Sequence, residues 1–258
     1  MWTEEVPRCR AQVIVRITAI CAVSLVAACG KSDATNTADS AETRARRGAA
    51  PVESTTVGGG GATGGAPERS GAPRGLFIGT SLTAGLGLSD PASESWPGVV
   101  QHLADSTGVP LLVVNSGLSG ETSAGALRRA DWVFGEPYDL VVIETGANDG
   151  LRGVDPDSTA ANIAALIAKA RAANPRATVM LVQMEAPTNL GPRYTRAFHD
   201  LFPRVARETG AVLLPFLLDG VGGVPRMNQG DGIHPTAEGA RMAALNVWPG
   251  IRFALRQR

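Results

Sequence analysis

The chain contains few cysteines, and all of them lie near its N-terminus. Cys9, Cys21 and Cys29 are the three cysteines among 258 residues, so residues 30–258 have none. Disulfides, thiol nucleophiles and Cys-ligated metal sites all need this residue. We therefore expect none of them in the later part of the chain.

An excess of charge of either sign is also missing. The sequence has 24 Lys and Arg against 24 Asp and Glu, which gives a formal net charge of zero. Proteins that bind nucleic acid carry clustered basic surface, so the balance argues against a nucleic-acid partner. A hydrophobic content of 44% is typical of a folded globular protein.

The first 29 residues have the pattern of a targeting segment. Arg8, Arg10 and Arg16 precede an apolar stretch at 17–28 that is too short to span a bilayer comfortably. The stretch ends in small residues before Cys29, which resembles the lipobox of bacterial lipoproteins. The resemblance implies a lipidated Cys29 and an exported lipoprotein on the periplasmic side of a membrane. A secretory signal peptide cleaved nearby, giving a secreted protein, and an uncleaved anchor are the alternatives.

Composition changes between residues 30 and 74, where Gly, Ala, Ser, Thr and Pro dominate. Such a segment buries too little apolar surface to offset the entropy of ordering it. We expect a disordered tether over 30–74, between a signal segment at 1–29 and a folded domain at 75–258.

The domain alternates between two kinds of segment, one suited to strands and the other to helices. Short apolar runs suit buried parallel strands, and the longer segments between them have helical periodicity. This alternation predicts a parallel sheet covered by helices on both faces. The predicted strands are Gly75–Gly79, Leu111–Asn115, Leu140–Thr145, Thr178–Met184 and Val212–Phe216, and the predicted helices are Ser93–Asp105, Thr122–Val133, Thr159–Ala173, Arg193–Thr209 and Thr236–Phe253.

Ligand sites in such sheets form at the carboxyl ends of the strands. Motifs whose side chains could take part in a reaction follow the predicted strands here. GTSLTAG at 79–85 follows the first, NSGLSGET at 115–122 the second and ETGANDG at 144–150 the third. GDGIHP at 230–235 lies near the C-terminus. We expect these four segments to form one site.

The chain has only three histidines, and one of them lies in a loop. His102 and His199 fall within helical segments, whereas His234 follows Asp231 by three residues in a Gly-rich stretch. Acyl transfer needs a neutral imidazole to take the serine proton, held in one tautomer by a carboxylate. Asp231 and His234 could supply this pair, although the aspartate could equally cap the final helix.

Ser81 is the candidate nucleophile. Between a strand and a helix, its backbone N–H would be free to stabilise a developing oxyanion. The Gly-x-Ser-x-Gly elbow of another hydrolase fold is absent, because Thr83 stands where that pattern needs glycine.

Taken together, the four motifs resemble the SGNH, or GDSL-type, hydrolase family at Ser81, Gly120, Asn148 and His234. Shorter stretches such as 148–153 and 231–235 are similar to its bacterial thioesterase I, lysophospholipase and arylesterase branch. The resemblance implies a flavodoxin-like three-layer α/β/α sandwich with a five-stranded parallel sheet. It also implies a serine esterase that needs no cofactor and no metal.

The roles of the site residues also follow from the resemblance. Ser81 would attack the acyl carbonyl, with His234 as general base and Asp231 orienting it. Ser81, Gly120 and Asn148 would form the oxyanion hole. Glycine permits the backbone conformation that a main-chain donor needs.

Three positions around these motifs call for comment. The family usually has aspartate before the nucleophile, where this chain has Thr80, which puts the support of that loop in doubt. Glu121 stands where the branch often has aspartate. Asp149 is interpreted as a residue that organises its loop.

Substrate choice is harder to predict. The loop after the fourth strand, with Pro187, Asn189 and Leu190, is expected to overhang the site and contact a small-molecule or lipid ester. The domain is expected to be monomeric. Alternatives are a deacetylase of cell-envelope carbohydrate and a non-catalytic binding lipoprotein. A dinucleotide-binding protein is disfavoured, because GTSLTAG lacks the Gly-x-Gly-x-x-Gly spacing.

Overall fold

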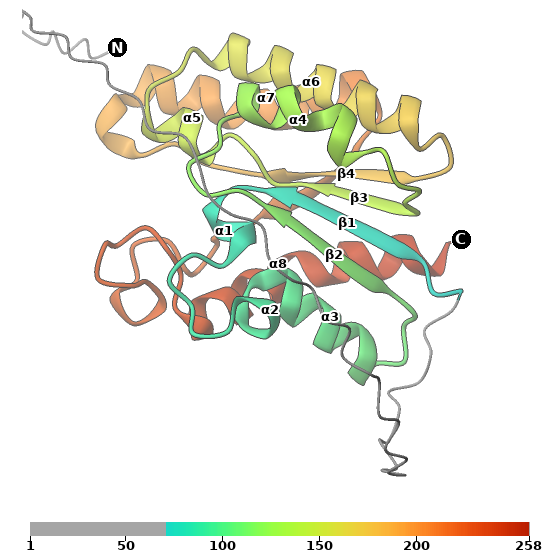
Figure 1. Cartoon of the computed structure of the whole chain (residues 1–258). Helices are drawn as coiled ribbons and strands as arrows, with labels where there is room; N and C mark the ends of the chain where they lie inside the picture. Colours follow the sequence, from blue (N-terminus) through green and yellow to red (C-terminus); the bar gives the residue numbers. More distant parts are fainter. Residues whose placement is uncertain (1–70, 258) are drawn as a thin grey trace, which may run out of the picture. The chain divides into compact units, whose positions relative to one another are not determined.

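The centre of the fold is a five-stranded parallel sheet with the strand order β2-β1-β3-β4-β5 (Figure 1). The computed structural model describes residues 71–257, so the predicted signal segment and most of the predicted tether lie outside the described residues. Each pair of neighbouring strands is parallel. The strands are β1 (Arg74–Gly79), β2 (Leu112–Gly117), β3 (Leu140–Ile143), β4 (Thr178–Gln183) and β5 (Val212–Phe216).

Helices cover both faces of this sheet, which confirms the predicted three-layer α/β/α architecture. Figure 1 shows α4, α6 and α7 on one face and α3 and α8 on the other. No helix within residues 71–257 is long and apolar enough to cross a membrane. The α-helices are α1 (Ser81–Ala84), α2 (Pro91–Glu94), α3 (Trp96–Ser106), α4 (Ser123–Val133), α5 (Ala147–Leu151), α6 (Pro156–Ala173), α7 (Pro192–Thr209) and α8 (Ala237–Arg256), with 3₁₀ turns η1 (Thr188–Leu190) and η2 (Pro225–Met227).

Burial of the strands differs from the prediction at the two edges of the sheet. Every residue of β3 is buried, as is nearly all of β1 and β4. In contrast, Leu112 in β2 and Val212 and Leu213 in β5 are 36–45% exposed. An edge strand has a neighbour on one side only, and the helices cover it less completely. The prediction of buried strands was therefore wrong for β2 and β5.

The predicted helix Ser93–Asp105 is two helices, α2 and α3. Ser95 separates them in an extended conformation, and its hydroxyl accepts a hydrogen bond of 3.3 Å from the Gly98 N–H at the start of α3. Pro97 stands in the first turn of α3, where its missing N–H costs nothing. Two short helices, α1 and α5, were not among the predicted helix ranges. They come soon after β1 and β3 and carry Ser81 and Asn148.

Candidate active site

Ser81, His234 and Asp231 form one hydrogen-bonded chain at the carboxyl edge of the sheet. The Ser81 Oγ lies 2.9 Å from the His234 Nε2, and the His234 Nδ1 lies 2.5 Å from the Asp231 Oδ2. Ser81 is the first residue of α1, directly after β1, whereas the other two lie in the loop between η2 and α8. The fold thus brings together residues that are 153 positions apart.

The turn from Asp231 to His234 is held by the aspartate itself. Its Oδ1 accepts hydrogen bonds from the backbone N–H groups of Ile233, at 2.9 Å, and His234, at 3.0 Å. The bond from the imidazole and these two backbone bonds hold the pKa of the Asp231 carboxyl well below its usual range. An ionised Asp231 accepts from Nδ1–H, and this leaves the Nε2 lone pair facing the Ser81 hydroxyl.

Gln229 ties the histidine loop to the nucleophile turn. Its side-chain amide donates to the carbonyl oxygen of Leu86 at 2.8 Å and to that of Pro235 at 2.9 Å. Its backbone N–H donates to the His234 carbonyl at 2.7 Å. One residue therefore connects the loops that follow β1 and β5, and keeps the imidazole in register with Ser81.

Three donors are available for an oxyanion. Within the described residues, the backbone N–H groups of Ser81 and Gly120 have no hydrogen-bond acceptor in the chain. Gly120 has a φ of +77°, a left-handed conformation that favours glycine. The Asn148 Nδ2 donates to the Glu121 carbonyl at 2.9 Å, which fixes the amide beside the Gly120 loop and leaves its second N–H unused.

A buried ion pair between Arg129 and Glu121 supports the Gly120 loop. Arg129 Nε and Nη2 donate to the two carboxylate oxygens of Glu121, both at 2.7 Å. The same guanidinium donates to the Ser116 hydroxyl and carbonyl at 2.7 Å each. The longer side chain at Glu121 thus reaches α4 and pins the loop to β2.

Asp149 organises the neighbouring segment, as the sequence suggested. Its buried carboxylate accepts from the Ser123 N–H at 2.8 Å and from the Ser123 hydroxyl at 2.6 Å. Thr159 Oγ1 adds a longer bond of 3.3 Å. Asp149 therefore joins α5, which carries Asn148, to the starts of α4 and α6.

Glu144 is the residue that sequence reasoning missed. Its carboxyl group is fully buried at the end of β3 and accepts from the Thr80 N–H at 2.8 Å and from the Thr83 hydroxyl at 2.9 Å. Burial raises the pKa of this carboxyl, while the donors from Thr80 and Thr83 oppose the rise. A charged residue at the end of an otherwise apolar run was the available signal in the sequence.

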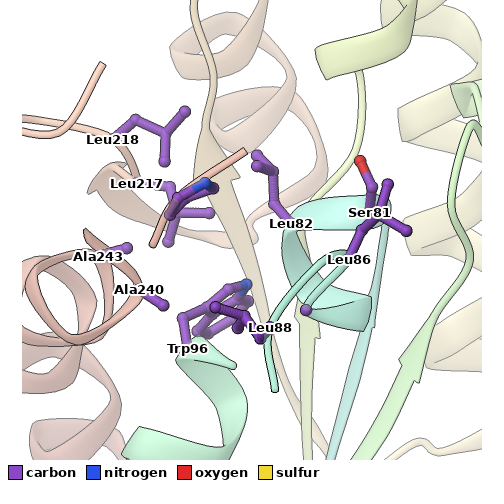
Figure 2. Close-up of a pocket in the computed structure, with 11 residues that line it drawn as sticks. Ser81, Leu82, Leu86, Leu88, Trp96, Leu217, Leu218, Ala240 and Ala243 are labelled. Atoms are coloured by element: carbon purple, nitrogen blue, oxygen red, sulfur yellow. The ribbon is translucent and has the colours of Figure 1, made fainter. Parts of the chain in front are cut away.

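Next to the nucleophile lies a narrow apolar crevice between α1, α3, α8 and the chain after β5. Figure 2 shows Ser81 at the margin of the group, apart from Trp96 and Ala243. In this conformation the crevice has room for about one water molecule. Its walls are Ser81, Leu82, Gly85, Leu86, Leu88, Trp96, Leu217, Leu218, Pro235, Ala240 and Ala243.

The predicted substrate loop is not part of this crevice. Leu190 instead lines a wider groove with Asp155 and Tyr194, between the start of α6 and α7. Contact of Pro187, Asn189 and Leu190 with substrate therefore stays a prediction. His102 and His199 are exposed on α3 and α7, and His199 pairs with Glu185 at 2.7 Å.

A Ser-His-Asp chain, unused backbone donors and an amide on a doubly wound sheet define a serine hydrolase of the SGNH type. No group of three or more potential ligand side chains in residues 71–257 is arranged to hold a metal ion. The chain belongs to the GDSL-like Lipase/Acylhydrolase family, whose model matches residues 77–242.

Individual relatives agree with this assignment. The chain is 42% identical to Esterase TesA of Pseudomonas aeruginosa over 69% of this chain and 87% of that protein. It is 37% identical to Thioesterase 1/protease 1/lysophospholipase L1 of Escherichia coli, over 63% and 76% of the two chains. The crystal structure of the psychrotrophic esterase EstA from Pseudoalteromonas, inhibited by monoethylphosphonate, superposes with a TM-score of 0.66 at 32% identity, over 71% and 99%. The chain is an ester-hydrolysing enzyme of this family.

Proposed function

We propose that the enzyme hydrolyses carboxylic esters through an acyl-enzyme on Ser81. The observation that carries this proposal is the 2.9 Å contact between Ser81 Oγ and His234 Nε2, backed by Asp231 at 2.5 Å from Nδ1. His234 takes the hydroxyl proton as Oγ bonds to the acyl carbon. Asp231 stabilises the imidazolium that results.

Charge on the former carbonyl oxygen is then stabilised by the N–H groups of Ser81 and Gly120 and by the free N–H of Asn148. When the ester bond breaks, His234 gives its proton to the departing alkoxide, and the alcohol leaves. Water attacks the acyl-enzyme next, and the imidazole takes one water proton and returns it to Ser81 Oγ. The products are one carboxylic acid and one alcohol, and Ser81 and His234 end as they began.

Hydrolysis of a soluble ester tests the assignment directly. Ser81→Ala should lower kcat for p-nitrophenyl butyrate by about 10⁴-fold or more and abolish labelling by a fluorophosphonate probe. Ser119→Ala, in the neighbouring loop, is the matched control and should keep both. Unchanged turnover in Ser81→Ala would overturn the proposal.

Several kinds of ester are compatible with this mechanism. Acyl, aryl and lysophospholipid esters and thioesters are all candidates, since the relatives carry the names esterase, thioesterase and lysophospholipase. A profile of kcat/KM against acyl-chain length, for oxygen esters and thioesters, separates them. Loss of selectivity in Leu190→Ala would support substrate contact by the loop containing Pro187 and Asn189.

Removal of acetyl groups from cell-envelope carbohydrate is the second candidate. The crevice beside Ser81 must widen for either substrate, and it must widen far less for an acetyl group than for a long acyl chain. Faster turnover of an acetylated sugar than of butyrate and longer esters would support this alternative.

We also propose that the enzyme is an exported lipoprotein anchored through Cys29, with a monomeric catalytic domain. The Arg-rich start, the short apolar stretch and the small residues before Cys29 support the anchor. Metabolic labelling with a fatty acid should mark the native chain and not Cys29→Ala, and a signal in that variant would contradict the anchor. Sedimentation of the purified chain tests the monomer.

A further inference from the structure

Five large apolar side chains are exposed in the five segments that follow the strands, with Leu151 at the end of α5 and Leu190 at the end of η1. They follow β1, β2, β3, β4 and β5 in turn, so the parallel topology places all five at the carboxyl edge of the sheet. We call this set the apolar rim. Its members are Leu86, Leu118, Leu151, Leu190 and Ile233, with exposed fractions of 47%, 51%, 46%, 36% and 44%.

Three members of the rim lie beside the reacting groups. Ile233 stands between Asp231 and His234, and Leu118 precedes the donor Gly120 by two residues. Leu86 is connected to the histidine loop because its carbonyl accepts from Gln229. Exposed apolar surface at a site entrance marks contact with a partner or a membrane, and here that contact would adjoin the approach to Ser81.

Positive charge accompanies one part of the rim. Leu118 lines a groove together with Arg128 and Arg152, and Arg152 Nη2 donates to the Gly120 carbonyl at 3.0 Å. Glu121 is the only acidic residue lining that groove, and Arg129 pairs with it. Within the described residues, neither Arg128 nor Arg152 belongs to an ion pair.

Four other carboxylates near this edge are hydrogen-bonded or ion-paired within the chain. Asp231 accepts from His234, and Glu185 pairs with His199. Asp90 and Asp155 cap α2 and α6. The groove lined by Leu118 therefore combines an exposed apolar side chain with two cations that belong to no ion pair, and the exposed Leu151 directly precedes one of them, Arg152. Apolar side chains together with such cations bind anionic lipid surfaces.

We propose that the apolar rim, with Arg128 and Arg152, docks the catalytic edge onto the surface of an anionic lipid aggregate. The inference rests on the proposed esterase function, because it gives ester substrates a route from a lipid surface to Ser81. Leucines would enter the boundary between head groups and acyl chains, while the guanidinium groups pair with head-group phosphates.

Vesicle co-sedimentation of the Ser81→Ala chain tests docking without hydrolysis of the lipid. We expect binding to vesicles of phosphatidylcholine with phosphatidylglycerol, and weaker binding to phosphatidylcholine alone. Leu118→Ser combined with Leu151→Ser should lower the partition coefficient on both at least tenfold, from roughly two lost apolar side chains. Arg128→Gln should lower it about fivefold on the anionic vesicles only, and Arg152→Gln should behave alike.

Phe253→Ser is the matched control. Phe253 is 66% exposed near the end of α8, which begins just after the histidine loop at the catalytic edge and runs away from that edge (Figure 1). This variant should bind as tightly as its parent. Equal binding by the leucine variant, or equal loss in the Phe253 variant, would overturn the proposal.

A second copy of the chain is the competing occupant of the rim. One outcome of sedimentation velocity is a dimer of the parent that dissociates when Leu118→Ser and Leu151→Ser are introduced. If the parent then also fails to bind vesicles, lipid docking is overturned in favour of that interface. Turnover of soluble p-nitrophenyl butyrate by the chain with Ser81 intact reports on the esterase function separately, so the two proposals fail independently.

Discussion

Thr80 and Glu144 are joined by the backbone and the side chain of the threonine. The Thr80 N–H lies 2.8 Å from the Glu144 Oε2, and the Thr80 hydroxyl lies 3.0 Å and 3.1 Å from the two carboxyl oxygens. Thr83 donates to the same carboxyl and accepts from Trp96 Nε1 at 3.1 Å. Thr80, the residue before the nucleophile, is thus held by the carboxyl group of Glu144 at the end of β3.

Restoring the family's aspartate at position 80 should therefore be harmful here. Thr80→Asp places a second carboxyl group against Glu144 in a buried site, where two carboxylates cannot both ionise without strong repulsion. We expect a loss of about 1–3 kcal/mol in the free energy of unfolding near pH 8 and a smaller loss near pH 5, where the pair can share a proton. Chemical denaturation at the two pH values measures both.

Thr80→Asn is the neutral control for that change, since it matches aspartate in shape but adds no charge. Its loss of stability should be independent of pH over the same range. An aspartate variant as stable as the parent at pH 8 would mean that the loop rearranges to separate the two carboxyl groups.

Glu144→Gln should change how stability depends on pH. Burial raises the pKa of the Glu144 carboxyl above its ordinary 4.5. Between the pKa of the unfolded chain and that of the folded protein, the folded protein therefore binds more of this proton than the unfolded chain does. The stability that this group contributes is fully present below its pKa in the unfolded chain, and it is lost as the pH rises through its pKa in the folded protein. Relative to the glutamine variant, the parent should therefore lose stability as the pH increases from about 4.5.

Urea unfolding of both proteins across that range gives the difference directly. Glu208→Gln removes an exposed carboxylate on α7 and should leave the slope of the parent unchanged. A difference between parent and Glu144→Gln that stays flat with pH would show that Glu144 titrates alike in the folded and unfolded chain.

Much of the fold was predictable because parallel strands and their covering helices leave periodic patterns in the sequence. The five strands and the two-sided helix cover are confirmed. The short helices α1 and α5 were not predicted, since four or five residues are too few to show a period. Edge exposure of β2 and β5 depends on strand order, which alternating segments do not determine.

Some residues of the site were predictable from the sequence and others were not. Ser81, Gly120, Asn148 and His234 stand in motifs, so their approach to one another could be anticipated from the resemblance. The support from Glu144 and Arg129 could not, because each contact joins residues from elements distant in the chain. Ser116, Glu121 and Arg129 meet only once α4 has packed over the sheet.

Asn148→Ala should slow the chemical step more than it weakens binding. Losing one oxyanion donor costs about a hundred- to a thousandfold in kcat, and KM should change little, since the donor acts on charge that develops in the transition state. Steady-state kinetics with p-nitrophenyl butyrate separate the two constants. Asn162→Ala is the control, because the Asn162 amide donates to the Ser123 hydroxyl and not to the site. Its kcat should stay within a fewfold of that of the parent. A larger KM with kcat unchanged in Asn148→Ala would contradict the assigned role.

Arg129→Ala should destabilise the enzyme through the partner that it leaves behind. Glu121 has a side chain only 4% exposed, and without the guanidinium its carboxylate would be buried and unpaired. Removing one partner of such a pair costs about 3–5 kcal/mol in the free energy of unfolding. Adding Glu121→Gln to Arg129→Ala removes the unpaired charge and should recover part of that loss. Equal stability of the single and double variants, measured by chemical denaturation, would show that the arginine acts through Ser116 and packing and not through Glu121.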